Sequence, residues 1–138
     1  MQEAISDFLS ARIFAVAGVS RDPSKYGHKV FQALVESGRN SSGGRVYPIN
    51  PQAGEIGEQR AYAGLSELPQ VPESLSIVTP PAVTAELISQ AIRLGVKNIW
   101  MQPGAENPEA SQEARQAGVN VIDDGSCLLV ALALEKKD

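Results

Sequence analysis

Five short apolar segments that alternate with segments of helical periodicity constrain the fold of this chain most strongly. Segments that are apolar throughout are typical of parallel strands buried on both faces. The expected strands are RIFAVAG (12–18), RVYPIN (45–50), SLSIVT (74–79), NIWM (98–101) and VNVI (119–122). The expected helices cover residues 3–10, 27–37, 82–94, 107–118 and 127–136. This order predicts an α/β fold: one three-layer, doubly wound, Rossmann-like domain over residues 1–138, with a mainly parallel five-stranded sheet.

Local signals define one helix start and one long connection. Asn107 can cap the helix that follows it, Pro108 suits the first turn, and Gly118 is placed to end that helix. The connection from 50 to 74 is long for such a fold, and we expect a short strand or a turn within it near residues 61–68.

Composition and charge exclude several classes of protein. The net charge of −4 disfavours a general nucleic-acid binder, and a single cysteine, Cys127, excludes an internal disulfide within these 138 residues. With one histidine and one cysteine, no zinc motif is formed, so no metal site is expected. The longest apolar run, 127–134, is far shorter than the ~20 residues of a membrane span. We expect a cytoplasmic protein with neither a nucleic-acid nor a membrane partner.

The loop after the first strand lies where α/β proteins bind phosphate, yet it lacks the usual glycine spacing. Ser20 and Pro23 stand where the G-x-G-x-x-G fingerprint needs glycine, and no Gly-Lys-Ser/Thr motif follows. The loop still offers Gly18, the Ser20 hydroxyl, Lys25 and the start of a helix. Together these groups can hold an anion. Residues 12–45 carry six basic and two acidic side chains, a local excess of positive charge that favours the same interpretation.

The end of the second strand argues against an ordinary NAD site. Enzymes that bind NAD usually place Asp or Glu there to hold the ribose hydroxyls. Here the strand ends in Asn50 and Pro51, and the next carboxylate is Glu55. The missing acidic residue is less unfavourable for a ligand that carries an additional phosphate near the ribose than for NAD.

Several stretches together resemble a known family. They are VAGVSRDPSKYGHKVFQAL, VYPINPQAGEIGEQRAYAGLSELP, VTPPAVTAELISQAIRLGVKNIWMQPGAEN and EARQAGVNVIDD. This ordered set resembles the small stand-alone CoA-binding proteins of bacteria and archaea, whose Rossmann-like domain is similar to the N-terminal domain of the succinyl-CoA synthetase α subunit. The resemblance covers residues 8–131.

The resemblance implies a site for coenzyme A or acyl-CoA. The phosphate groups would be held by Gly18, Ser20, Lys25, Tyr26 and Gly27, and the pocket after the second strand would be lined by Asn50 and Pro51. The wall against the nucleotide would be formed by Thr79, Pro80, Pro81 and Val83. The pantetheine path would be bordered by Gln102, Gly104, Ala105 and Asn107. Asn-Pro and Pro-Pro are also common in turns, so a purely structural role stays open for those pairs.

The segment DDGSC departs from the family pattern. Relatives often carry Asp-Arg-Cys after the fifth strand, whereas here Asp124 is followed by Gly125 and Ser126, and Cys127 lies one residue later. No thiol or guanidinium role is therefore assigned. Cys127 opens an apolar helix and is expected in the core, while Asp123 and Asp124 are expected to fill the turn before it.

No catalytic residue is expected. His28, the single histidine, has Asp22 as its only nearby carboxylate in sequence, and a loop or surface role is favoured over a catalytic one. The leading hypothesis is non-catalytic binding of coenzyme A or acyl-CoA through the loop after the first strand. The alternatives are an NAD(P)-binding redox sensor or small oxidoreductase, and an interaction module with a vestigial pocket. Residues 128–134 are apolar all round, so this helix is expected to be buried on more than one side, within the chain or in a homodimer.

Overall fold

The protein is built around a five-stranded parallel sheet. A computed structural model describes residues 2–52 and 54–135. The strands, in chain order, are β1 (Ile13–Ala17), β2 (Arg45–Ile49), β5 (Ser74–Ile77), β6 (Asn98–Met101) and β7 (Asn120–Ile122). They lie in the order β2-β1-β5-β6-β7, and each neighbouring pair is parallel. Strand order reverses direction beside β1, so the switch point lies between β1 and β5.

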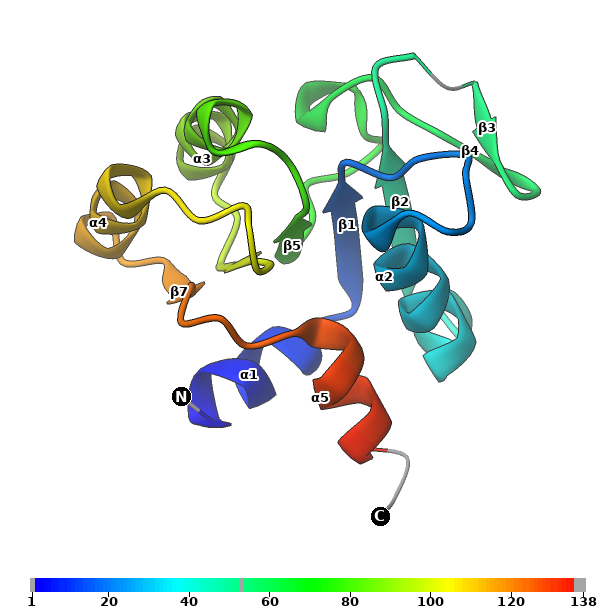
Figure 1. Ribbon diagram of the computed structural model, residues 1–138, viewed down its shortest axis with the longest axis horizontal. Helices are drawn as coiled ribbons and strands as arrows, with labels where there is room; N and C mark the ends of the chain where they lie inside the picture. Colours follow the sequence, from blue (N-terminus) through cyan, green and yellow to red (C-terminus); the bar gives the residue numbers. More distant parts are fainter. Residues whose placement is uncertain (1, 53, 136–138) are drawn as a thin grey trace.

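Helices cover both faces of this sheet, which confirms the predicted fold. The helices α1 (Gln2–Leu9), α2 (Tyr26–Leu34) and α5 (Leu128–Glu135) lie on one face, and α3 (Pro81–Leu94) and α4 (Pro108–Gln116) lie on the other (Figure 1). Alternate residues of β1 face opposite layers, because successive strand side chains point to opposite sides. Phe14 and Val16 pack toward α2, and Ala15 and Ala17 pack toward α3.

The boundaries differ from expectation in small ways. After α2, the chain continues as a single π-helical turn, η1 (Val35–Arg39), in which Gly38 has a φ of 90°. The third expected strand ends at Ile77 because Pro80 already stands at the N-cap of α3. Helix α4 begins as predicted: Asn107 Oδ1 accepts the backbone N–H of Ala110.

The long connection after β2 contains a hairpin that the sequence did not predict. Strands β3 (Glu55–Ile56) and β4 (Gln59–Arg60) pair antiparallel through a two-residue loop. Gly57 has a φ of 63° at the first position of that loop, where a type II′ turn places glycine. The expected short element near 61–68 is present: Tyr62 forms a parallel bridge with Ile49, and a 3₁₀ turn, η2, covers Leu65–Glu67.

Helix α5 is less buried than its sequence suggested. Leu128 and Leu132 are buried against the sheet, but Val130 is 57% exposed and Leu134 is 58% exposed. The expectation that this helix is buried on more than one side is therefore wrong for the isolated chain, and a homodimer through it stays a prediction. Among the residues that the structure describes, no helix has the length and apolar character that a membrane span requires.

Candidate functional site

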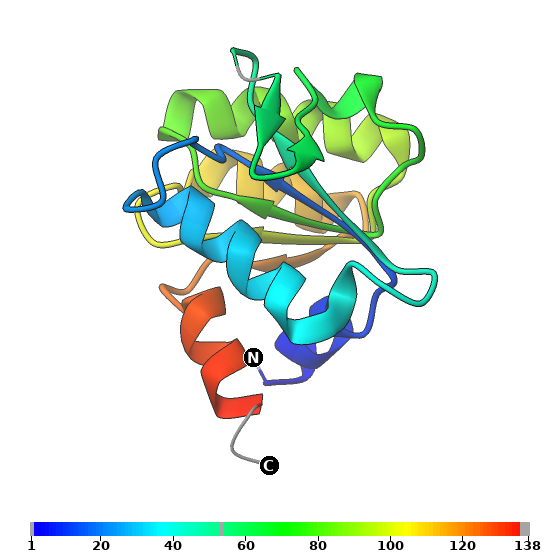
Figure 2. The ribbon, with the colours of Figure 1, turned by 90° about the vertical axis from the view of Figure 1, so that its right-hand side faces the viewer.

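A cleft of about 190 Å³ lies at the switch point, where the carboxyl ends of β1, β2 and β5 meet the first turns of α3. The loops that follow β1, β6 and β7 gather at this same end of the sheet, at the left of Figure 2. The residues that line the cleft are Ala17, Gly18, Ile49, Pro51, Ala63, Gly64, Thr79, Val83, Glu86, Leu87 and Gln90. Ligands of doubly wound proteins bind at this position.

Two glycines of the loop after β1 let three backbone segments approach closely. Gly18 has a φ of 92°, and a Cβ there would lie 2.0 Å from the carbonyl oxygen of Val78. A Cβ on Gly27 would lie 2.1 Å from the carbonyl oxygen of Gly18. Gly27 therefore gives the close helix–strand packing that the third glycine of the dinucleotide fingerprint supplies, but from a longer loop. This explains why the fingerprint spacing fails although the geometry is similar.

The rest of this loop is held by its own hydrogen bonds. Ser20 Oγ accepts the N–H of Asp22 at 3.0 Å, and Asp22 Oδ1 accepts both the N–H and the hydroxyl of Ser24, which lowers the Asp22 pKa. Lys25 is exposed at the N-cap of α2, and its ammonium makes no hydrogen bond or ion pair within the described part of the chain. The sequence-predicted anion-binding groups are thus ordered while their charge is unused.

The start of α2 has no cap. Lys25 supplies no side-chain hydrogen bond to the helix, and the N–H groups of Tyr26, Gly27 and His28 have no acceptor among the described residues. The ring of His28 is turned back on the loop, with Nδ1 2.7 Å from the carbonyl oxygen of Ser20. Three unpaired N–H groups at the positive end of a helix dipole are suited to an anion.

Asn50 fixes the loop instead of presenting a free amide. Its Nδ2 donates to the carbonyl oxygen of Val19 at 2.7 Å, and its Oδ1 accepts the N–H of Gln52. Pro51, the next residue, contributes to the wall of the cleft. The predicted pair thus divides: Asn50 joins the ends of β1 and β2, and Pro51 faces the cleft.

The four residues predicted as a nucleotide wall also divide. Thr79 and Val83 line the cleft, and Val83 is 44% exposed. Pro80 and Pro81 are exposed at the start of α3 and are not among the lining residues. The hydroxyl of Thr79 lies 2.9 Å from that of Thr84, so it is already hydrogen-bonded.

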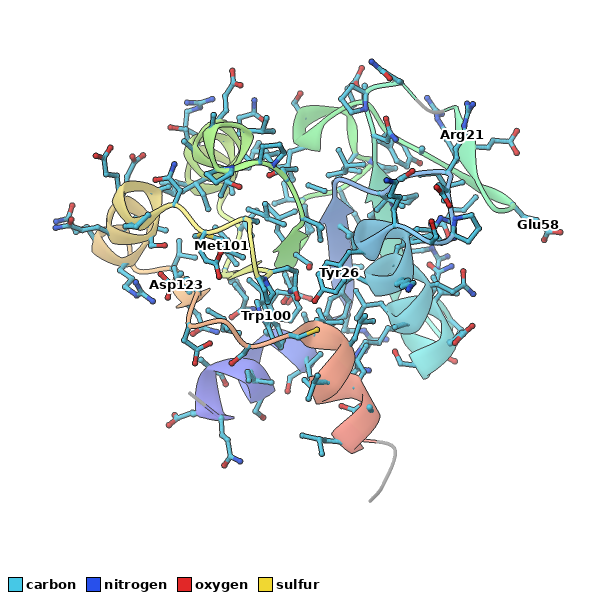
Figure 3. All side chains as sticks on the ribbon, viewed as in Figure 1. Arg21, Tyr26, Glu58, Trp100, Met101 and Asp123 are labelled. Atoms are coloured by element: carbon cyan, nitrogen blue, oxygen red, sulfur yellow. The ribbon has the colours of Figure 1, made fainter. Side chains whose placement is uncertain are left out.

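The half-buried side chains of Tyr26 and Cys127 form a hydrogen-bonded cluster with the buried Gln102. Figure 3 shows Tyr26 extending from α2 toward the centre of the molecule. Its hydroxyl donates to Gln102 Oε1 at 3.1 Å and lies 2.6 Å from Cys127 Sγ; burial raises the pKa of Tyr26. Gln102 is fully buried, and it also accepts the N–H of Leu128 and donates to Ser76. Neither Tyr26 nor Gln102 is among the residues that line the cleft.

The Cys127 thiol does not lie in the core, where the sequence had predicted it. Cys127 is half-buried just before α5, and it belongs to the Tyr26 cluster. Asp124 Oδ1 accepts the N–H of Ser126, so the prediction that Asp123 and Asp124 fill the turn is confirmed for Asp124. Asp123 instead forms an ion pair with Arg115 at 2.7 Å.

The remaining predicted residues surround the loop after β6. Gly104 is exposed with a φ of 96°, and its N–H donates to the Glu106 carboxylate. Ala105 is only 2% exposed. Asn107, besides capping α4, donates to the carbonyl oxygen of Pro81 at 3.0 Å and so joins the starts of α3 and α4. A Cβ on Gly104 would meet nothing within 4 Å, so this position is open to a ligand.

The positive charges of residues 12–45 do not all gather at the loop. Arg12 and Arg45 stand at the amino ends of β1 and β2, and Arg39 is paired with Glu135. Parallel strands place these ends opposite the cleft. The prediction that the positive charge of residues 12–45 gathers at the loop is therefore wrong for these three arginines. Arg21, Lys25 and Lys29 remain on the side of the loop.

A larger groove of about 740 Å³ lies away from the switch point, between α2, β2 and the β3–β4 hairpin. Volume alone would favour it, but no carboxyl end of a strand of the five-stranded sheet and no start of an α-helix is among its lining residues. Its floor seals the edge of β2: Asn40 Oδ1 accepts the N–H of Val46, and Gln59 Nε2 donates to the Val46 carbonyl oxygen. We therefore place the site at the smaller cleft. Within the described residues, no group of three or more His, Cys, Asp or Glu side chains is arranged to hold a metal ion.

The Arg115–Asp123 pair gives a pH-dependent prediction. The hydrogen bonds from Arg115 lower the Asp123 pKa, so the pair stabilises the fold above the unfolded pKa of about 3.9 and this stabilisation is lost as the pH falls through the lower folded value. Since Arg115 is 48% exposed, we expect Asp123→Asn to cost at most about 1 kcal/mol at pH 7. Urea denaturation at pH 7 and pH 3 measures this. The cost should be smaller at pH 3 than at pH 7, and Asp7→Asn, at an exposed position, should show no such change; an equal cost of Asp123→Asn at both pH values would contradict the assignment.

Sequence reasoning missed part of the cleft. Glu86, Leu87 and Gln90 follow Val83 at helical spacing, so the pattern of α3 held a signal for them. Ala63 and Gly64 come from the long connection and reach the cleft because Tyr62 pairs with the end of β2. Nothing local in the sequence indicates that return.

A parallel α/β sheet with a cleft at its switch point and an uncapped helix beside it defines a Rossmann-like ligand-binding domain. Residues 12–133 match the family described as CoA binding domain. The chain belongs to that family, as the resemblance predicted.

Similar proteins include several from archaea. The α subunit of ADP-forming acetate–CoA ligase II from Pyrococcus furiosus is 34% identical over 92 residues, which are 67% of this chain and 19% of that subunit. This chain spans 13–26% of the length of the curated relatives it matches. A conserved hypothetical protein from Pyrococcus furiosus has a TM-score of 0.77 and 33% identity, with 87% of this chain and 98% of that chain covered. A hypothetical protein from Pyrococcus horikoshii has a TM-score of 0.83 and 29% identity, with 94% and 88% covered.

Proposed function

We propose that this chain binds coenzyme A or an acyl-CoA at the carboxyl end of its sheet, without transforming it. One observation carries the proposal: in a chain of the CoA-binding domain family, the switch-point cleft and the uncapped start of α2 meet at the loop that begins with Gly18. The adenosine end would occupy the cleft, and the phosphates would pass over Gly18 toward α2.

The start of α2 supports phosphate binding through its charge. The positive end of a helix dipole stabilises an anion by about 0.3–1 kcal/mol when exposed and about 2 kcal/mol when partly buried. Lys25 adds a point charge that forms no ion pair within the described residues, although it lies close enough to Asp22 to help lower the pKa of that carboxyl. Coenzyme A carries three phosphate groups, so it gains more from this arrangement than a ligand with fewer.

A binding role without catalysis is supported by how the reactive side chains are used. The His28 ring faces a backbone carbonyl, the Cys127 thiol and the Tyr26 hydroxyl contact each other, and Asp123 is paired with Arg115. None of these groups forms a nucleophile–base pair beside the cleft. We propose a carrier, sensor or accessory role for the chain.

Isothermal titration calorimetry with coenzyme A, NADH and NADPH, each added separately, tests the proposal. We expect heat of binding with coenzyme A and a weaker response, or none, with either nicotinamide cofactor. Tight binding of NADH or NADPH without a response to coenzyme A would establish the alternative, a redox sensor or oxidoreductase. No heat from any of the three would favour an interaction module with a vestigial pocket.

Lys25→Ala tests the phosphate part of the site. We expect coenzyme A binding to weaken by about 1.5–3 kcal/mol, because a charge-assisted hydrogen bond to phosphate is lost. Calorimetry of the variant measures this, and a shallower dependence of affinity on salt should accompany it. Lys97→Ala, an exposed lysine before β6 at the opposite end of the sheet, is the matched control. Equal affinities of the Lys25 variant and the control would remove Lys25 from the site.

A further inference from the structure

The charge of the cleft shows which part of a nucleotide fits there. Glu86 is the one charged side chain among its lining residues, and no Lys, Arg or His contributes to its wall. A carboxylate at the rim repels phosphate, whereas the apolar surfaces of Ile49, Val83 and Leu87 suit a flat ring. The volume of about 190 Å³ is below the roughly 300–1,000 Å³ of pockets for whole ligands, so it holds one part of a ligand. The cleft therefore fits a heterocyclic base.

Gln90 and Glu86 are the polar side chains of the cleft wall that make no hydrogen bond to the described residues, and Gln90 is the more buried of the two. Among residues 2–52 and 54–135, every other buried or half-buried Asn and Gln has a hydrogen-bonded side chain. Gln90 is half-buried and lines the cleft, and its amide makes no hydrogen bond to these residues. No buried side-chain nitrogen or oxygen of the described residues lacks a partner, so the Gln90 amide is open to solvent in the cleft and is free to pair with a ligand.

We propose that Gln90 is the residue that recognises the base of the bound nucleotide, an inference that rests on the proposed function. Adenine presents its exocyclic amine, a donor, next to a ring nitrogen that is an acceptor, and a glutamine amide pairs with both. Gln90 Oε1 accepts from the amine, and Nε2 donates to the ring nitrogen.

Glu86 adds discrimination to this contact. It lies one turn before Gln90 on α3 and faces the same cleft. A glutamine amide can rotate to fit a 6-oxo purine, so by itself it tolerates hypoxanthine. A carboxylate accepts a hydrogen bond from the 6-amine but repels a 6-oxo group. The two side chains together therefore select adenine.

A cycle of two ligands and two proteins tests the contact. The probes are adenosine 3′,5′-bisphosphate and the analogue in which hydrogen replaces the 6-amino group, each titrated by calorimetry into the full chain. The variant is Gln90→Met, which keeps the length of the side chain and removes its polar atoms. Gln112→Met, at an exposed position of α4, is the matched control.

We expect the natural chain and the control to lose about 10-fold to 100-fold in affinity when the amine is removed, as for a bidentate amide–adenine pair. Gln90→Met should lose several-fold less than this, because Glu86 is then the one remaining partner of the amine. An equal loss in variant and natural chain would overturn the proposal, even if both bind adenosine 3′,5′-bisphosphate well. Thermal unfolding of Gln90→Met checks that it folds.

The two levels of inference fail differently. If the natural chain binds neither coenzyme A nor adenosine 3′,5′-bisphosphate, the proposed function fails and Gln90 loses its role with it. If the natural chain binds both ligands and the amine has no effect on affinity, the proposed function stands and the base-recognition role of Gln90 is rejected.

Discussion

Gly18→Ala is expected to destabilise the protein by about 2–5 kcal/mol and to abolish ligand binding in the fraction that folds. A left-handed φ costs a non-glycine residue about 1–2 kcal/mol, and Gly18 has a φ of 92°. The new Cβ would also lie 2.0 Å from the Val78 carbonyl oxygen, and such overpacking typically costs about 1–3 kcal/mol. Relief of this contact would move β1 away from β5 at the switch point, where the cleft is. Urea denaturation and coenzyme A calorimetry measure the two effects.

Gly118→Ala separates these two causes. Gly118 has a φ of 87°, close to that of Gly18, but a Cβ there would meet nothing within 4 Å. We expect a loss of about 1–2 kcal/mol, the conformational cost alone, with unchanged binding. If both variants lost the same stability, the close approach of Gly18 to β5 would not be the reason for glycine at this position.

Gln102→Leu is expected to lower the free energy of unfolding by about 3–5 kcal/mol. The side chain is fully buried, and its removal leaves the Leu128 N–H and the Ser76 hydroxyl without their partner and takes away one of the two partners of the Tyr26 hydroxyl. Each buried polar group left unpaired costs about 1–3 kcal/mol. Gln116→Leu, at the exposed end of α4, should change stability by about 0.5 kcal/mol or less. Urea denaturation of both variants measures the difference.

The same variant decides between two roles for Gln102. The family resemblance placed it beside the pantetheine path, whereas the structure gives it no exposed surface. We expect the folded variant to bind coenzyme A within a few-fold of the natural chain. A fully stable Gln102→Leu protein that no longer binds coenzyme A would restore the residue to the ligand site.

The fold was predictable because its signals are local and repeated. Apolar runs of strand length alternate with helical periodicity, and Asn107 and Pro108 mark a helix start that the structure confirms. The β3–β4 hairpin was not predictable with the same rules, since two-residue strands are too short to show periodicity. Only Gly57 gave a signal there, and a lone glycine does not separate a hairpin from a loop.

The site was predictable in part. Gly18, Pro51, Thr79 and Val83 follow strands, and the rule that ligands bind beyond strand ends was enough to find them. Tyr26, Asn50 and Gln102 also follow strands or begin helices. Their side chains, however, make hydrogen bonds within the protein and are not among those that line the cleft. Position after a strand does not say which way a side chain points.

By itself, the sequence determined the order of strands and helices, the parallel sheet and the family, because periodicity and ordered motifs are properties of neighbouring residues. The tertiary structure alone decided which polar groups are satisfied. The Gln102 amide makes hydrogen bonds to residues that lie 26 and 76 positions away in the chain, while the Gln90 amide makes none to the described residues and lies beside the cleft. The reason is physical: whether a buried amide is paired depends on segments that only folding brings together.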